Sequence, residues 1–344
     1  MHAGYSHIDT AYVYGGEKTE AQVGAALRSA FAGSSARAPL ARSDVFVTTK
    51  QWRKFHGYAE TRKCLATSLR RLGLEAVDLY LIHWPGAAWS TMARKKELTD
   101  ADPFHYALDG HDAAALPALR AETWRAMEDA LAEARARARA RVQSRAVSRR
   151  ALSALVSAPP PSSRLSPRRR FAQGQTRAIG VSNFTVEHLE ALRRTARVWP
   201  PAVNQVECHP YHTQRELREY CAREGIVLQA YSSLGGQDAG RGVLAPLGGP
   251  LLEHPAVAAA AKAAAAGEGT QAPTAAQVLL RWALQRGIAV LPKSRSEARA
   301  RENLSAMNAP HLDEGALEAL DALDAGSNGR LAWRSDPLRL LEFS

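Results

Sequence analysis

The sequence has few of the features that mark membrane, secreted or disulfide-stabilised proteins. Its 344 residues include three cysteines, Cys64, Cys208 and Cys221. They form no CxxC pair, so neither a disulfide framework nor a zinc site is expected. No run of about twenty apolar residues exists to span a membrane, and the start, MHAGYSHIDT, lacks the charged residues and apolar centre of a signal peptide. We therefore expect a globular, cytoplasmic protein.

Acidic residues are missing from one long segment, and this absence accounts for the net charge of +11. Residues 134–173 contain eleven arginines and no Lys, Asp or Glu; without those arginines the 45 basic residues fall to 34, equal to the 34 acidic ones. A stretch so rich in Arg, Ala, Ser and Pro cannot bury enough apolar surface to offset the conformational entropy that it would lose on ordering. We expect a disordered surface insertion, or sequence foreign to the mature protein. The alternative is a nucleic-acid-binding arm, which its single aromatic residue, Phe171, disfavours.

Outside that segment the chain alternates between short apolar runs and helical patterns. Seven strand-then-helix units follow one another, and their expected strands are SHIDTA, VFVTTK, VDLYLIH, RAIGVSN, AVNQVE, IVLQAYSSL and IAVLPKS. Apolar runs of this kind are typical of a parallel sheet buried on both faces. Repeated units make either a doubly wound sheet or an eight-stranded barrel. No GxGxxG follows any strand, which counts against the doubly wound dinucleotide fold.

Polar or ionisable residues stand at the carboxyl end of every expected strand, the face that carries the chemistry in a barrel. The first three strands end near Asp9, Lys50 and His83, and Tyr14 lies in the loop after the first. A phenol is a weak acid with a pKa of about 10, and a neighbouring ammonium lowers such a pKa. Asp, Lys, Tyr and His together make a proton donor aimed at a developing alkoxide. A hydride source is missing from this set, which implies a nicotinamide cofactor. Each residue alone also has a structural explanation, such as an Asp9–Lys50 salt bridge.

Several stretches occur in an order that resembles the aldo-keto reductase family, in particular its aldose reductase branch. They are GYSHIDTAYVYGGE, VFVTTKQW, VDLYLIHWP, AIGVSNF, VNQVECHPY, AYSSLG and LPKSRSEARARENL. The resemblance runs from about residue 4 to about residue 325, outside 134–173. It implies a (β/α)8 barrel that uses NADPH to reduce aldehydes and ketones. The implied catalytic residues are Asp9, Tyr14, Lys50 and His83, with Tyr14 as the acid.

The resemblance also implies a cofactor site. Ser182, Asn183 and Gln205 match the positions that hold the nicotinamide carboxamide, and Tyr231 matches the tyrosine that stacks on the ring. Ser232, Leu234 and Asp238 resemble the loop over the pyrophosphate. The adenosine end is matched by Lys293, Ser294, Ser296, Arg299, Glu302 and Asn303.

The last group has a physical interpretation as well. The stretch runs from a strand end into a helix start, where backbone N–H groups favour an anion. Lys293 and Arg299 add positive charge, and a guanidinium binds phosphate through two hydrogen bonds. A 2′-phosphate is therefore expected, which favours NADP over NAD. The alternative is an ordinary solvated helix face.

Three features depart from the family pattern. Ser233 replaces a usual proline. Residues 134–173 interrupt a single barrel domain expected over 1–330, followed by a tail at 331–344; the junction lies on the face opposite the chemistry, where insertions cost little. The family's N-terminal hairpin, first strand and first helix precede the point at which this chain starts, so we expect an open barrel edge. A catalytically compromised, cofactor-binding or regulatory protein is therefore the alternative function.

The expected substrate pocket is formed by two tryptophans and two loop regions. Trp52 and Trp84 are expected to form apolar walls beside His83. Residues 85–120 and the C-terminal tail, including Trp333, are expected to supply the specificity loops. The expected partner is a small carbonyl compound bound by a monomer, with no metal, membrane or nucleic acid.

Overall fold

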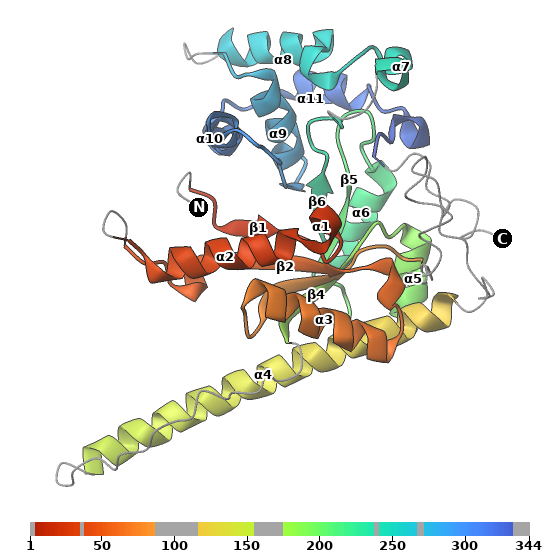
Figure 1. Cartoon of the computed structure of the whole chain (residues 1–344). Coiled ribbons are helices and arrows are strands. Elements are labelled where there is room, and N and C mark those ends of the chain that lie inside the picture. The colour runs from red at the N-terminus through yellow and green to blue at the C-terminus, as the bar shows by residue number, and fades with distance from the viewer. Residues whose placement is uncertain are drawn as a thin grey trace.

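The structure, a computed structural model, describes residues 4–34, 38–86, 116–154, 175–236, 241–266 and 272–332. Its centre is a seven-stranded sheet in which strand order follows the chain from β1 to β7 (Figure 1). The strands are β1 (His7–Asp9), β2 (Phe46–Gln51), β3 (Val77–Ile82), β4 (Thr176–Ser182), β5 (Val203–Glu207), β6 (Val227–Tyr231) and β7 (Ala289–Val290).

All seven expected strands are present, and each pairs in parallel with its neighbours in the chain. Lys50 lies opposite Leu81, for example, and Glu207 opposite Tyr231. The last strand is much shorter than the run IAVLPKS suggested. The Leu291 N–H still donates to the Ala230 carbonyl (3.1 Å), but Pro292 has no N–H with which to continue the ladder.

Helices follow the strands and lie outside the sheet (Figure 1). They are α1 (Tyr14–Glu17), α2 (Thr19–Ala32), α3 (Tyr58–Leu72), α4 (Leu116–Ala154), α5 (Val186–Arg193), α6 (Arg215–Glu224), α7 (Arg241–Leu244), α8 (Pro255–Ala266), α9 (Ala275–Gln285), α10 (Glu297–Ser305) and α11 (Glu314–Asp321). Short 3-10 turns are η1 (Arg42–Asp44), η2 (Arg53–Phe55), η5 (Ala245–Leu247), η6 (Leu251–Glu253), η7 (Ala306–Asn308) and η8 (Gly326–Gly329).

Helix α3 shows how local sequence sets these elements. The expected apolar face of Leu65, Leu69 and Leu72 is buried, as a 3.6-residue period requires. The helix ends at Gly73, which has φ 68° and donates to the Arg70 carbonyl. A left-handed residue at this position favours glycine because it has no Cβ.

Among the described residues the hydrophobic core has two parts. The larger part fills the space between the sheet and its helices and includes Val47, Tyr80, Ile179 and Leu228. The smaller part consists of Tyr12, Trp52, Phe55, Cys64 and Trp84, which cluster beside the carboxyl ends of β1–β3. This second cluster is a rigid apolar support next to the residues expected to do chemistry.

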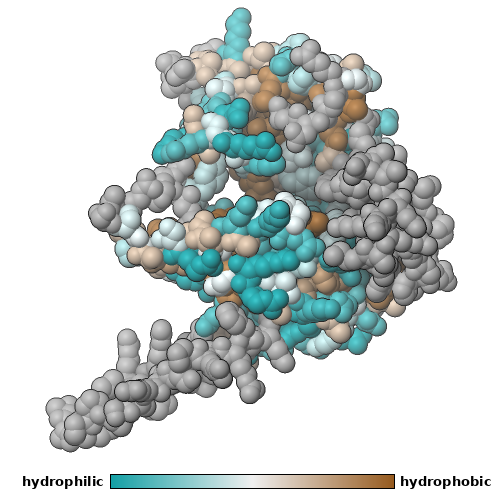
Figure 2. All heavy atoms as spheres, in the orientation of Figure 1, coloured by the Kyte–Doolittle hydropathy of each residue, from teal (hydrophilic) through white to brown (hydrophobic). Residues whose placement is uncertain are grey.

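The sheet has two edges within the described residues, because β1 pairs only with β2 and β7 only with β6. The segment before β1 crosses toward α10, where the Tyr5 hydroxyl donates to the Ala300 carbonyl (3.0 Å). Figure 2 shows the surface hollowed between the parts formed by α10 and α2. The described residues thus supply seven strand–helix units of a (β/α)8 barrel, and no described strand fills the position between β1 and β7.

Helix α4 corrects one expectation. Residues 134–154 continue α4 to Ala154, and the helix projects well beyond the sheet (Figure 1). The expectation of disorder from residue 134 is therefore wrong for this part. Alanine and arginine are among the strongest helix formers, and extending a helix that already exists avoids the cost of nucleation. The same helix starts at Leu116, so residues 116–120 belong to it and not to a loop.

Candidate active site

The carboxyl ends of the strands bring together the residues expected to act in catalysis. Asp9 is the last residue of β1, Lys50 is next to last in β2, and His83 directly follows β3. Tyr14 starts α1, five residues after β1. Because all strands are parallel, their carboxyl ends meet at one edge of the sheet.

Lys50 is the centre of this group. Its side chain is fully buried and forms a short ion pair with the Asp9 carboxylate. The ammonium also donates to the Thr10 carbonyl (3.0 Å) and to the Tyr14 hydroxyl (3.3 Å). All three of its protons therefore have acceptors, which fixes the charge against the phenol oxygen.

The charge of Lys50 is maintained by its partners. Burial lowers the pKa of Lys50, but the negative charge of Asp9, the Tyr14 oxygen and the hydrogen bonds to both outweigh burial. The net result is a pKa above the ordinary value, so Lys50 is an ammonium ion at neutral pH.

His83 faces Tyr14 and is neutral. Their ring centroids lie 5.7 Å apart in an edge-to-face arrangement. Burial holds the pKa of His83 well below its usual value, and the charges of Lys50 and Arg53 lower it further. Its Nδ1 atom is buried without a hydrogen-bond partner. The phenol, the ammonium and a neutral imidazole thus line one site.

The side chains of two glutamines, Gln205 and Gln229, form a hydrogen-bonded chain that ends at Asp9. The Gln205 amide donates to Asp9 Oδ2 and to Gln229 Oε1, both at 2.8 Å. Gln229 is a residue that the sequence analysis missed. It lies opposite Gln205 in the pairing of β5 with β6, and a glutamine inside an otherwise apolar strand was the available signal.

The ends of β4 and β6 form a second polar group beside the first. Ser182 donates to the Gln205 carbonyl (2.6 Å), and Asn183 donates to the His83 carbonyl (2.9 Å). The Tyr231 hydroxyl donates to Asn183 Oδ1 (2.9 Å). Asn183 has φ 64°, a left-handed conformation that asparagine tolerates better than most residues. The structure thus gathers Ser182, Asn183, Gln205 and Tyr231 beside the ion pair.

Aromatic rings wall the site on the β2–β3 side. The Trp52 and His83 centroids are 5.5 Å apart, and His83 and Trp84 are stacked at 6.3 Å. His56, also missed from sequence, holds this wall: its Nε2 donates to the Trp84 carbonyl (3.1 Å). Burial lowers the pKa of His56 to about 3, so the ring is neutral and acts as a structural donor.

The loop after β6 is partly described. Ser232 has φ 53° and Leu234 is half-buried. The neighbouring Ser233, which replaces a usual proline, donates its hydroxyl to the Ala230 carbonyl (3.0 Å). Asp238 lies outside the described residues, as do Trp333 and residues 87–115.

The residues expected at the adenosine end lie on the segment from β7 into α10. Ser296 caps α10 by accepting from the Arg299 N–H, and Ser294 accepts from the Ser296 N–H (3.0 Å). Lys293 and Arg299 are exposed, whereas Asn303 is buried and Glu302 half-buried. The described hydrogen bonds of this group are separate from those around Lys50.

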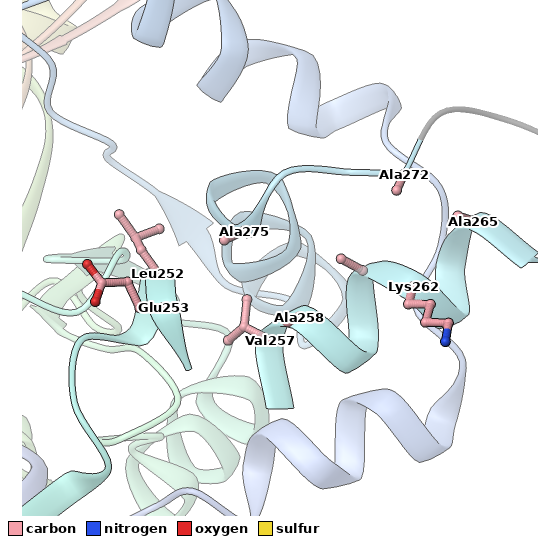
Figure 3. Close-up of a pocket in the computed structure, with 9 residues that line it drawn as sticks. Leu252, Glu253, Val257, Ala258, Lys262, Ala265, Ala272 and Ala275 are labelled. Atoms are coloured by element: carbon pink, nitrogen blue, oxygen red, sulfur yellow. The ribbon is translucent and has the colours of Figure 1, made fainter. Parts of the chain in front are cut away.

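A hollow of ≈ 430 Å³ lies elsewhere, between η6, α8 and the start of α9 (Figure 3). Alanines and two larger apolar side chains dominate its lining, which consists of Leu252, Glu253, Val257, Ala258, Ala261, Lys262, Ala265, Ala272 and Ala275. None of them stands at a strand end, so this hollow is not the site. In the part of the chain that is described, no metal-binding cluster of His, Cys, Asp and Glu occurs. No helix there combines the length and apolar character needed to cross a membrane.

Comparisons with curated proteins identify relatives along most of the chain. The chain is 32% identical over 321 residues to the uncharacterized oxidoreductase YtbE of Bacillus subtilis, covering 93% of this chain and 80% of that protein. It is also 32% identical over 324 residues to D/L-glyceraldehyde reductase of Hypocrea jecorina, covering 94% and 77%.

Solved structures agree in fold. An aldo-keto reductase from Bombyx mori in complex with NADP gives a TM-score of 0.66 at 28% identity, covering 97% of this chain and 82% of that one. The aldose reductase of Schistosoma japonicum gives 0.65 at 27% identity, covering 94% and 81%. The family model of the aldo/keto reductases matches residues 1–138 and 170–325. With this match, these relatives and the seven strand–helix units, the chain belongs to the aldo/keto reductase family.

Proposed function

We propose that this chain reduces aldehydes and ketones to alcohols with NADPH and that Tyr14 donates the proton. The observation that carries the proposal is the fully buried Lys50 ammonium, held by Asp9 and placed 3.3 Å from the Tyr14 hydroxyl. A positive charge at that distance stabilises negative charge on the phenol oxygen as the proton leaves. Few structural roles require an ammonium aimed at a phenol inside a polar cluster.

The neighbouring residues fit the parts of NADP. A carboxamide offers one acceptor and two donors, and Ser182, Asn183 and Gln205 present hydroxyl and amide groups at adjacent strand ends. Tyr231 offers a half-buried aromatic ring next to them. Lys293 and Arg299 would hold phosphate near the start of α10, and Ser296 and Asn303 would contact the adenosine end. When bound, the reduced nicotinamide supplies the hydride.

The protein residues then act in order around the carbonyl oxygen of the substrate. Tyr14 and neutral His83 direct hydrogen bonds to that oxygen and polarise the carbonyl. Tyr14 gives up its proton as negative charge develops, and Lys50 stabilises the remaining phenolate. Trp52 and Trp84 exclude water from this side of the site, which strengthens these interactions.

Small carbonyl compounds are the proposed substrates. Relatives of this chain bear the names D/L-glyceraldehyde reductase and glyoxal reductase. The wall of the site beside His83 is apolar because it is built from Trp52 and Trp84. We propose a reducing, cytoplasmic compartment, because Cys64, Cys208 and Cys221 are free and buried thiols. We also propose that the protein is a monomer. We also propose one barrel domain interrupted near 134–173.

Replacing Tyr14 with phenylalanine tests the proposal. The ring and its packing remain, and only the acid is lost. NADPH oxidation by a test aldehyde should fall by about 10²–10⁴-fold, while NADPH affinity measured by fluorescence stays unchanged. Tyr58→Phe is the matched control, because Tyr58 is 40% exposed and donates to Asp129 on the outer surface.

The outcomes separate the alternatives. Activity retained in Tyr14→Phe would assign the acid elsewhere, with His83 as the next candidate. A parent protein that binds NADPH but turns over no carbonyl compound would favour a cofactor-binding or regulatory role. A parent protein that does not bind NADPH would contradict both the reductase function and the cofactor-binding role.

A further inference from the structure

Glu207, at the carboxyl end of β5, holds a part of the chain far away in sequence. Its side chain is only 2% exposed. The carboxylate accepts from the backbone N–H of Leu331 (2.7 Å) and of Ala332 (2.9 and 3.1 Å), and from His209 Nε2 (3.0 Å). Burial raises the pKa of Glu207, but the hydrogen bonds from His209 and from the two backbone N–H groups outweigh it, so the pKa lies below its ordinary value. A charged carboxylate therefore clamps the backbone at 331–332.

The loop that follows β5 continues this attachment. Thr213 donates its hydroxyl to Asp324 (2.6 Å), and the Tyr211 carbonyl accepts from the Ala325 N–H (3.0 Å). Gly329 approaches so closely that a Cβ there would lie 1.5 Å from the Tyr211 carbonyl oxygen. Residues 208–214 and 324–332 thus form one continuous interface, and only glycine fits at its tightest point.

The clamped segment reaches the wall of the site. The Arg330 guanidinium lies 5.8 Å from the ring of Trp84, the residue after His83, and its Nε is 3.9 Å from the Glu207 carboxylate. Leu331 is buried and packs against the loop after β6 at Gly236. The segment Arg330–Ala332 therefore connects the ends of β3, β5 and β6 at the mouth of the barrel.

We propose that Glu207 is a positioning residue whose carboxylate fixes Arg330–Ala332 across the barrel mouth, so that Arg330 and Trp84 set the affinity for the carbonyl substrate. This inference rests on the proposed function of the site. Glu207 makes no described contact with Asp9, Tyr14, Lys50 or His83, so it acts on substrate binding and not on proton transfer. The stretch VECHPYHT, which contains none of the proposed catalytic residues, anchors the segment at residues 324–332.

Glu207→Gln tests the anchoring by hydrogen exchange. The substitution keeps the side-chain shape but turns one acceptor into a donor that faces backbone N–H groups. Losing hydrogen bonds to a charged group should speed amide exchange at Leu331 and Ala332 by about tenfold or more. Glu216→Gln, on the exposed face of α6, is the matched control and should leave exchange there unchanged. Arg330→Ala is the second variant: it removes the link to Trp84 and leaves the backbone clamp in place.

Steady-state kinetics test the effect on the site. Glu207→Gln and Arg330→Ala should both raise KM for a test aldehyde about fivefold or more, with kcat and NADPH affinity nearly unchanged. Unchanged exchange at 331–332 in Glu207→Gln overturns the anchoring. A loss in kcat at constant KM overturns the positioning of the mouth. Absence of turnover in the parent protein overturns the proposed function instead, and the exchange measurement still decides the anchoring.

Discussion

Replacing Asp9 with asparagine should destabilise the protein in a way that depends on Lys50 and on pH. Asp9 is the only carboxylate described within ion-pair distance of the Lys50 ammonium, which is completely buried. Asparagine keeps the shape and one acceptor oxygen but removes the negative charge. The ammonium would then have only neutral acceptors: the new amide oxygen, the Thr10 carbonyl and the Tyr14 hydroxyl.

The size of the effect follows from the attraction between opposite charges that the substitution removes. At an effective dielectric constant of about 20, unit charges about 4 Å apart attract by about 4 kcal/mol. The retained hydrogen bond offsets about 1 kcal/mol of this loss. The free energy of unfolding should therefore fall by about 3 kcal/mol near pH 7, within the range for breaking one side of a buried pair.

The sign of the pH dependence follows from the pKa of Lys50. In the parent protein this pKa is raised above the unfolded value, so its stabilising contribution is full below the unfolded pKa and is lost as pH rises through the folded pKa. In Asp9→Asn burial dominates and the folded pKa drops below the unfolded value. The penalty is then largest near neutral pH and shrinks as pH rises toward about 10.

Urea unfolding followed by tryptophan fluorescence would measure this at pH 7 and near pH 10. Lys50→Met supplies the control background, because it removes the charge with which Asp9 pairs, while Asp9, 14% exposed, keeps its hydrogen bond from Gln205. In the Lys50→Met background, Asp9→Asn should cost less than about 1 kcal/mol. An equal cost in both backgrounds, or a cost that grows with pH, would refute the electrostatic reasoning.

Two further predictions concern the cofactor and the segment that interrupts the family match. Arg299→Ala should weaken NADPH binding about tenfold or more in fluorescence titrations and leave NADH binding nearly unchanged, because only NADPH carries the 2′-phosphate. Arg301→Ala is the control and should change neither affinity, because the Arg301 side chain pairs with Glu297 (2.6 Å). Equal losses of affinity for both cofactors in Arg299→Ala would contradict the assignment. Deleting residues 139–169, which lie outside the family match, should leave the thermal midpoint and NADPH affinity unchanged; a protein that no longer folds would show that this segment packs on the barrel.

Local patterns in the sequence were sufficient to predict most of the architecture. Short apolar runs and 3.6-residue periods identified seven strands and the helices after them, because both signals reflect which side chains a local element must bury. The fully buried side of α3 is one example. The positions of Asp9, Lys50 and His83 at strand ends also followed, since parallel strands place their carboxyl ends at one edge.

Two local predictions failed where competing local effects decided the outcome. The arginine-rich composition suggested disorder after residue 133, but high helix propensity and an existing helix extend α4 to Ala154. The run IAVLPKS suggested a long strand, but Pro292 lacks the N–H that a ladder needs, and β7 has two residues.

Only the tertiary structure decided which distant side chains meet. Gln205 reaches Asp9 across 196 residues of chain, and Glu207 binds the Leu331 N–H across 124. Neither contact has a local signal, because each depends on strand order, on register and on how the sheet curls. The sequence by itself determined the elements and the chemical groups at their ends. The packing of those elements determined that Lys50 is buried and charged beside a phenol, and that Glu207 holds the backbone at residues 331–332, since burial and hydrogen bonding over such separations exist only in the folded chain.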